Sequence, residues 1–246
     1  MPYPNTWNDV LEAPSFIINL DRRPERWSQS FNEVQKAGFK NIQRWHAVDY
    51  KNKSQCDEAY TLLGHPPKHP SFNNDFQDYP GTWGVFLSQT TLWKKIVDEH
   101  IPYACIFEDD VLFHSQWEKL APVYFENTTH EYDILFMGSQ FEFRSEYHID
   151  KGPVFCLHAY MVTCEGAKQL LDYVMSTEAG GIYTIDTMLK VHMHAANPCF
   201  NWYVWNGTFF PDPKREMSGG WSKRNHGLVF QDVQFGSDVR QYDVGA

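Results

Sequence analysis

Long apolar runs, paired cysteines and an excess of positive charge are all missing from this 246-residue sequence. No stretch reaches the roughly 18 consecutive apolar residues of a membrane-spanning helix, and residues 1–12 lack the basic start and apolar middle of a signal peptide. We therefore expect a soluble, cytoplasmic protein without a membrane span.

The cysteines and the charge exclude further classes. The five cysteines are an odd number with no Cys-x-x-Cys pair, which argues against a disulfide framework and against a zinc site. The formal net charge is −10. Nucleic acid requires a basic stripe and anionic lipid attracts basic segments, so neither partner is expected. An anionic substrate would need a local cluster of positive charge.

The length and the order of the predicted elements indicate one α/β domain over residues 1–246. Strands are predicted at 16–20, 41–48, 103–107, 132–137 and 154–163. Helices are predicted at 25–37, 81–100, 115–125, 166–175 and 182–194. The remaining segments are predicted as an N-terminal extension (1–14), a long polar loop or lid (51–80) and an irregular C-terminal segment (197–246).

An acidic triplet, Glu108-Asp109-Asp110, stands between the apolar runs 103–107 and 111–113. Adjacent carboxylates repel one another and are costly to bury unpaired, so a nearby cation is the simplest compensation. Carboxylates suit Mg²⁺ or Mn²⁺, which proteins often hold with one or two acids and the phosphates of a substrate. A solvated turn is the alternative. The apolar flanks favour a metal, because open α/β sheets bind ligands at strand ends.

A small basic cluster follows the first predicted strand, in the stretch Asn19-Leu20-Asp21-Arg22-Arg23. A helix is predicted directly after it, so the arginines would lie beside the N–H groups of a helix start. Arginine forks and helix starts both bind phosphate, which predicts a phosphate site here. Ion pairing of the arginines with Glu25 and Glu33 is the alternative.

Three other polar positions stay open between a ligand role and a structural role. Asp49, after the second predicted strand, would hold a ribose hydroxyl or a base, or cap a turn. Ser88, with Gln89, interrupts the apolar surface of a predicted helix as a ligand contact or a satisfied core group. His158 lies within a predicted strand, where a lone histidine is usually a hydrogen-bonded core residue.

Several of these pieces, taken in order, resemble glycosyltransferase family 25, which includes bacterial lipooligosaccharide galactosyltransferases and collagen galactosyltransferases. The likeness covers most of the chain and rests on residues 16–27 (FIINLDRRPERW), 47–49 (AVD), 84–93 (GVFLSQTTLW), 103–111 (YACIFEDDV), 158–162 (HAYMV), 166–167 (GA), 170–171 (LL), 185–186 (ID) and 237–239 (SDV). The family usually has Ser-His where this chain has Ser88-Gln89. The likeness implies a GT-A-like single domain, with a mostly parallel central sheet flanked by helices.

The resemblance also implies a nucleotide-diphosphate sugar donor, most simply a UDP-sugar, and Mn²⁺ or Mg²⁺ at the acidic motif. Asp110 is the first choice for ligation, followed by Asp109 and Glu108. Another ligand is expected from the C-terminal segment, where His226 and Asp238 are the available types. The predicted donor-binding residues are Asn19, Leu20, Asp21, Arg22, Arg23, Asp49, Ser88, Glu108 and Asp109.

The predicted reaction moves a hexose of the galactose or glucose type to a hydroxyl of a glycan or glycoprotein, with inversion. Inversion needs a base for the acceptor proton. Asp186 is the first candidate, although an acid near a helix start is also ordinary helix chemistry, and His158 is the second.

Two other classes use the same residues. A metal-dependent phosphohydrolase or nuclease would release phosphate without sugar transfer, but two-metal sites usually draw acids from several strand ends. A silent nucleotide-sugar or carbohydrate-binding module would bind without turnover, but every acidic position of the resembled pattern is present.

Overall fold

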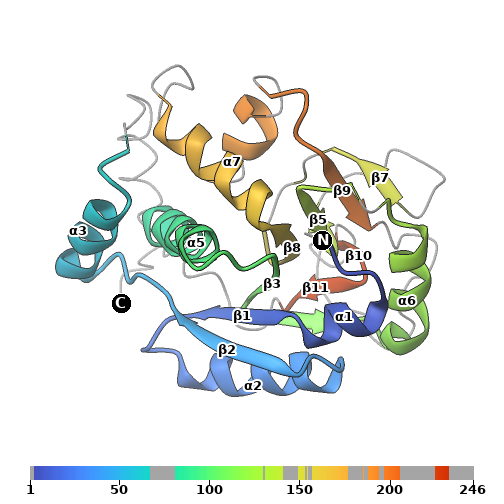
Figure 1. Cartoon of the computed structure of the whole chain (residues 1–246). Coiled ribbons are helices and arrows are strands. Elements are labelled where there is room, and N and C mark those ends of the chain that lie inside the picture. The colour runs from blue at the N-terminus through green and yellow to red at the C-terminus, as the bar shows by residue number, and fades with distance from the viewer. Residues whose placement is uncertain are drawn as a thin grey trace.

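A seven-stranded sheet in the order β2-β1-β3-β8-β5-β9-β7 forms the centre of the computed structural model. The structure describes residues 3–66, 81–129, 131–140, 149–152, 154, 157–176, 185, 188–193, 197–205 and 225–232, with the backbone alone at 140, 190–192, 225 and 226. Figure 1 shows α5 and α7 on one face of this sheet and α2 on the other.

The elements follow one another in mixed α/β order. The strands of the central sheet are β1 (Pro14–Asn19), β2 (Asn41–His46), β3 (Tyr103–Glu108), β5 (Ile134–Phe136), β7 (Ile149–Lys151), β8 (Ala159–Thr163) and β9 (Trp202–Trp205). Two antiparallel ladders pair β4 (Val111–Phe113) with β11 (Val229–Gln231), and β6 (Gly138–Gln140) with β10 (Asn225–Gly227). The helices are α1 (Trp7–Glu12), α2 (Pro24–Lys36), α3 (Lys53–Leu62), α5 (Gly81–Asp98), α6 (Trp117–Asn127) and α7 (Cys164–Met175), with a π-helix at Met188–Met193.

The sheet contains parallel and antiparallel pairs. β1 is parallel to β2 and to β3, and β5 is parallel to β9, whereas β8 is antiparallel to both of its neighbours and β7 to β9. The predicted α/β fold with helices flanking a central sheet is confirmed. Because β1, β2 and β3 are parallel, they end at one edge of the sheet, and the acidic triplet follows at the end of β3.

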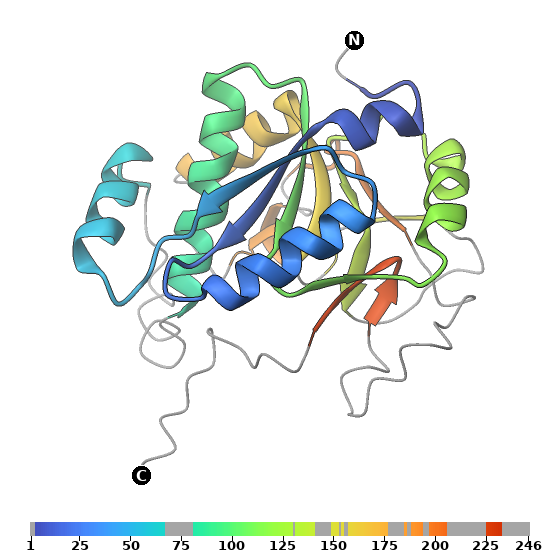
Figure 2. The same cartoon turned by 90° about the horizontal axis from the view of Figure 1, so that it is seen from below.

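Each face of the sheet carries its own apolar core. On β1, Phe16 and Ile18 enter one core while Ile17 enters the other, as the alternation of side chains along a strand requires. Figure 2, seen from below, shows α2 lying across the sheet on the second side. Burial on both faces explains why β1 and β3 are nearly continuous apolar runs in the sequence.

The first part of the predicted loop at 51–80 is helical. α3 begins after Asn52, whose side chain accepts a hydrogen bond from Gln55 N at 3.3 Å. Cys56 and Ala59 are its buried residues, so the apolar pattern is too sparse to indicate a helix in the sequence. Residues 67–80 lie outside the described part of the chain.

Both ends of the chain are more regular than predicted. Residues 1–14 include α1, which starts at a capping box: Thr6 Oγ1 accepts from Asp9 N at 3.2 Å, and Asp9 Oδ2 accepts from Thr6 N at 2.8 Å. The segment 197–246 contributes β9, β10 and β11. All residues of β9 are buried, so no alternation indicated a strand there. Within the described ranges, every helix is too short or too polar to span a bilayer.

Candidate active site

The acidic triplet occupies the turn between β3 and β4. Glu108 ends β3, and Asp109 and Asp110 form the turn itself. Asp109 is only 7% exposed, so the triplet is not a solvated surface turn. The end of β11 lies against this turn: Asp232, which directly follows β11, donates its N–H to Asp110 O at 2.6 Å. Segments far apart in the sequence therefore meet at the end of β3.

Asp109 is held by donors from two different elements. Arg26 Nη1, on α2, donates to Asp109 Oδ1 at 2.8 Å. Asn19 Nδ2, at the end of β1, donates to Asp109 Oδ2 at 2.6 Å. Arg44 Nη2, on β2, donates in turn to Asn19 Oδ1 at 2.5 Å. The side chains of Arg26 and Asp109 are 6% and 9% exposed, so a buried ion pair connects the turn to α2.

Asp110 has different surroundings. The residue is partly exposed, but its Oδ1 is buried and has no hydrogen-bond partner among the described residues. Burial, followed by the charge of Asp109, raises the pKa of Asp110 to about 7, with Asp232 adding to the rise and Arg26 opposing it. A cation beside Asp110 would favour its charged form and give Oδ1 a partner. The carboxylate therefore fits a hard cation such as Mn²⁺ or Mg²⁺.

Two further carboxylates flank the turn. Glu108 Oε2 accepts from Gln231 Nε2 at 3.0 Å, and Asp232 Oδ2 accepts from Gln29 Nε2 at 3.0 Å. In the described part of the chain, no three His, Cys, Asp or Glu side chains converge on a metal-binding position. Asp110 and Asp232 would nevertheless match the one or two protein carboxylates with which Mg²⁺ is commonly bound alongside substrate phosphates.

The predicted basic cluster is paired with carboxylates at the same edge of the sheet. Arg22 Nε donates to Asp49 Oδ2 at 2.8 Å, and Arg23 Nη1 lies 3.4 Å from Glu25 Oε1. The alternative that the arginines form ion pairs with Glu25 therefore holds for Arg23, whereas Arg22 pairs with Asp49, which was itself predicted to bind the donor. Arg22 and Asp49 therefore form one unit beyond the ends of β1 and β2.

Ser88 is buried and holds the segment that carries Asp49. Ser88 Oγ accepts from Val48 N at 2.8 Å and donates to Gly84 O at 2.5 Å, and Trp45 Nε1 donates to Ser88 O at 3.1 Å. A Cβ at Gly84 would lie 2.6 Å from Val48 O, so glycine permits this close approach of α5. Ser88 is therefore placed to support Asp49.

His158 is fully buried and directly precedes β8, which begins at Ala159 and not at 154 as predicted. Its Nε2 donates to Val229 O at 2.9 Å, and burial lowers its pKa to about 4. This is the hydrogen-bonded core position that was the alternative to a catalytic role. Gln89 is buried too, and its Oε1 accepts from Tyr160 Oη at 2.5 Å, so the glutamine at this position of the resembled motif takes part in core hydrogen bonding.

The side chains of three predicted candidates are not placed. Asp186 and Asp238 lie outside the described residues, and His226 is described in β10 by its backbone alone, so all three stay predictions. Sequence reasoning missed Asp232. Its signal was the apolar run 228–230, followed after Gln231 by an acid, which resembles the apolar run and acids of the triplet.

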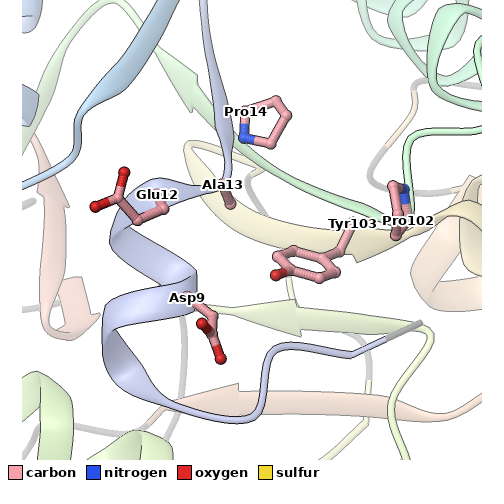
Figure 3. A pocket seen from close by; sticks show the side chains of 6 residues that line it. All are labelled: Asp9, Glu12, Ala13, Pro14, Pro102 and Tyr103. Carbon is pink, nitrogen blue, oxygen red and sulfur yellow. The ribbon is translucent and has the colours of Figure 1, made fainter. Parts of the chain in front are cut away.

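A separate hollow of about 210 Å³ lies at the other end of the same strands. Figure 3 shows the residues that line it, Asp9, Glu12, Ala13, Pro14, Pro102 and Tyr103. Because β1 starts at Pro14 and β3 at Tyr103, this hollow is at the opposite edge of the sheet from the acidic triplet.

Comparisons with known proteins relate the chain to one protein family. A family model described as "Glycosyltransferase family 25 (LPS biosynthesis protein)" matches residues 12–151. The chain is similar to a "Glycosyltransferase 25 family member" of Aedes aegypti, with 25% identity over 170 residues, which cover 64% of this chain and 27% of that protein. It is also similar to procollagen galactosyltransferase 2 of Homo sapiens, with 25% identity over 131 residues, covering 50% of this chain and 20% of that protein.

A bacterial relative matches a shorter segment. The lacto-N-neotetraose biosynthesis glycosyltransferase of Neisseria meningitidis serogroup B is 50% identical over 34 residues, which cover 14% of this chain and 12% of that protein. The matches thus span at most 27% of the length of these three relatives, so the likeness concerns one part of each.

Proposed function

The chain belongs to glycosyltransferase family 25, and we propose that it is a metal-dependent enzyme that transfers a hexose from a nucleotide-diphosphate sugar, most simply a UDP-sugar. The acceptor is a hydroxyl of a glycan or glycoprotein, and the reaction inverts the anomeric centre. The name of the human relative supports galactose as the first sugar to test. The observation that carries the proposal is the carboxylate of Asp110, which has a buried oxygen without a hydrogen-bond partner among the described residues, at the carboxyl ends of the parallel strands, where open α/β sheets bind ligands.

Asp110 and Asp232 are the residues that we assign to the cation. Mn²⁺ or Mg²⁺ held there would supply positive charge to the donor diphosphate and offset the charge that develops on the leaving nucleotide. Glu108 is the next acid of the turn and is held by Gln231. His226 and Asp238 remain the candidates for an additional ligand from the C-terminal segment.

Arg22 and Asp49 are assigned to the donor nucleotide. The Arg22 guanidinium brings positive charge to a negatively charged protein, where a diphosphate needs it. The Asp49 carboxylate would accept a hydrogen bond from a ribose hydroxyl. Their mutual hydrogen bond at 2.8 Å orients both groups before the donor arrives, which reduces the ordering that donor binding requires.

Asp186 is proposed as the base that takes the proton of the acceptor hydroxyl. A carboxylate suits this role in an inverting transfer. The buried position of His158 in the structure makes it the weaker candidate. Asp186→Asn should abolish transfer while Mn²⁺ and the nucleotide still bind, a combination that loss of folding would not give.

A screen of nucleotide sugars for hydrolysis and transfer, with and without Mn²⁺, tests the function. We expect one UDP-hexose to be turned over only with the metal, and Asp110→Asn to remove this activity. Glu99→Gln, which removes an acid from an exposed ion pair with Lys95, is the matched control. Phosphate release without sugar transfer would instead identify a phosphohydrolase, and metal-dependent binding without turnover a silent binding module.

A further inference from the structure

The two aspartates of the turn differ in how their oxygens are used. Both oxygens of Asp109 accept hydrogen bonds from buried protein donors, Arg26 Nη1 and Asn19 Nδ2, at 2.8 and 2.6 Å. Asp110 Oδ1 has no such donor among the described residues. The Asp109 carboxylate is therefore hydrogen-bonded within the protein through both oxygens, whereas the Asp110 carboxylate has one oxygen at which a cation can bind.

Direct ligation by Asp109 would be in conflict with these contacts. Its charge is already balanced by Arg26, and both side chains are nearly inaccessible, at 9% and 6% exposure. A cation bound to Asp109 would compete with the guanidinium for the same carboxylate, and displacing the guanidinium would leave a buried charge without its partner. Asp110 can meet a cation without breaking any hydrogen bond of Oδ1.

The contacts of Asp109 also reach beyond the turn. Asn19 ends β1, and its side-chain oxygen accepts from Arg44 on β2 at 2.5 Å. Arg26 lies in the first turns of α2. One carboxylate thus connects the β3–β4 turn to two strands and a helix. Such connections fix the position of the backbone that carries the neighbouring residue.

We infer that Arg26 and Asn19 are positioning residues that act through Asp109, and that Asp109 locks the acidic turn while Asp110 alone of the pair faces the cation. This inference deepens the proposed function and rests on it. It departs from the expectation that Asp109 is a metal ligand, and it adds Arg26 as a residue required for the rate of the reaction.

Mn²⁺ binding to the full chain, measured by electron paramagnetic resonance of the free ion in the presence of UDP, separates the two roles. The key variant is Arg26→Gln/Asp109→Asn, which removes one charge of each sign and leaves the local net charge unchanged. If Asp109 is a lock, this double variant keeps its Mn²⁺ dissociation constant within about threefold of the wild type. If Asp109 is a ligand, the double variant loses binding as completely as Asp110→Asn does.

Thermal unfolding without metal gives a second, independent readout. Arg26→Gln and Asp109→Asn should each lower the melting temperature, because each leaves a buried charge unpaired. The double variant should unfold at a higher temperature than either single variant, because replacing both partners leaves no unpaired charge. Lys36→Gln, on the same helix in an exposed ion pair with Glu33, is the control for loss of one positive charge.

Kinetics then test positioning itself. In the double variant we expect kcat of the donor reaction to fall at least tenfold while the KM of the donor stays within threefold. The cation still binds to Asp110, but the turn that carries Asp110 is no longer fixed. Arg26→Lys, which keeps the charge, should recover part of the rate lost in Arg26→Gln. An unchanged kcat in the double variant, or no rescue by lysine, overturns the positioning role.

The outcomes also separate this inference from the proposed function. If the wild type transfers sugar but the double variant no longer binds Mn²⁺, Asp109 is not a positioning residue, and the transferase assignment still stands. If the variants show the predicted Mn²⁺ binding and unfolding but the wild type transfers no sugar, the transferase assignment fails. The role of Arg26 and Asn19 in that reaction fails with it, while Asp109 still fixes the acidic turn.

Discussion

Carboxylates lie at both ends of the parallel strands β1 and β3, and their pKa values are shifted in opposite directions at the two ends. At the edge where the strands begin, Asp9 is partly exposed and its pKa is lowered by hydrogen bonds from the backbone and side chain of Thr6. At the edge where they end, burial and the neighbouring Asp109 raise the pKa of Asp110 to about 7. The first acid completes a helix cap, whereas one oxygen of the second has no hydrogen-bond partner in the described part of the chain.

The comparison shows why an acid-lined hollow is not by itself a site. The hollow near Asp9 and Glu12 has acidic residues and a defined shape (Figure 3). Yet the Asp9 carboxylate already accepts a hydrogen bond from Thr6 N, and Asp9 N donates one to Thr6 Oγ1, both at the start of its own helix. At the opposite edge, positive charge supplied from outside would stabilise the charged form of Asp110. Four predictions extend this comparison.

Replacing Asp110 should have the largest effect. Asp110→Asn is expected to lower the kcat/KM of the Mn²⁺-dependent reaction by about 10³-fold, as for the loss of one preorganised electrostatic contact to the transition state. Asp9→Asn should leave kcat/KM unchanged. Steady-state kinetics with the donor found in the screen measure both. Equal losses in the two variants would remove the distinction between the edges.

Replacing Asp109 should have the largest effect on folding. Asp109→Ala leaves the Arg26 guanidinium buried without its carboxylate, so the free energy of unfolding should fall by about 3–5 kcal/mol. Urea denaturation of the metal-free protein measures this change. A loss below about 1 kcal/mol, the value typical of an exposed ion pair, would show that the pair is not buried in solution.

The pH dependence of stability should carry the signature of Asp110. Its ordinary pKa is 3.8, and in the folded protein it is about 7. Between these values the folded state binds more protons than the unfolded state, so this group lowers the stability of the metal-free protein as pH rises from about 4 to about 7. The melting temperature of Asp110→Asn minus that of the wild type should therefore increase as the pH rises from about 4 to about 7. A constant difference between the two proteins across the window contradicts the raised pKa.

Removing the Ser88 hydroxyl should have the smallest effect of the four. Ser88→Ala deletes the acceptor of the Val48 N–H, and one such hydrogen bond contributes about 1 kcal/mol. If Ser88 positions Asp49, the KM of the donor should rise about fivefold with little change in kcat. Thr91→Ala, which removes another buried hydroxyl of α5 that bonds to its own helix, is the control. An equal change of KM in both variants would indicate general loosening of α5.

Much of this comparison was predictable from local sequence. The apolar run before Glu108-Asp109-Asp110 indicated a buried strand with acids at its tip, and Pro24 with the preceding basic residues indicated a helix start beside it. Each signal lies within about ten residues. Local periodicity therefore sufficed for β1, α2, α5 and β3, and for the edge of the sheet at which the site lies.

The partners inside the site were not predictable in the same way. Arg26 meets Asp109, and Asp232 meets the Asp110 backbone, across large separations in sequence. Only the strand order and the β4–β11 ladder bring these residues together. The division of roles between Asp109 and Asp110 depends on which side chain finds a buried donor, and two identical neighbouring residues give no sequence signal for that difference.

The most direct test of the central claim is the shift in melting temperature that Mn²⁺ with UDP produces in the wild type, Asp110→Asn and Asp9→Asn. We predict a clear upward shift in the wild type and in Asp9→Asn, because binding to the folded state stabilises it, and no shift in Asp110→Asn. A shift of the same size in Asp110→Asn would contradict the assignment of the cation to this residue.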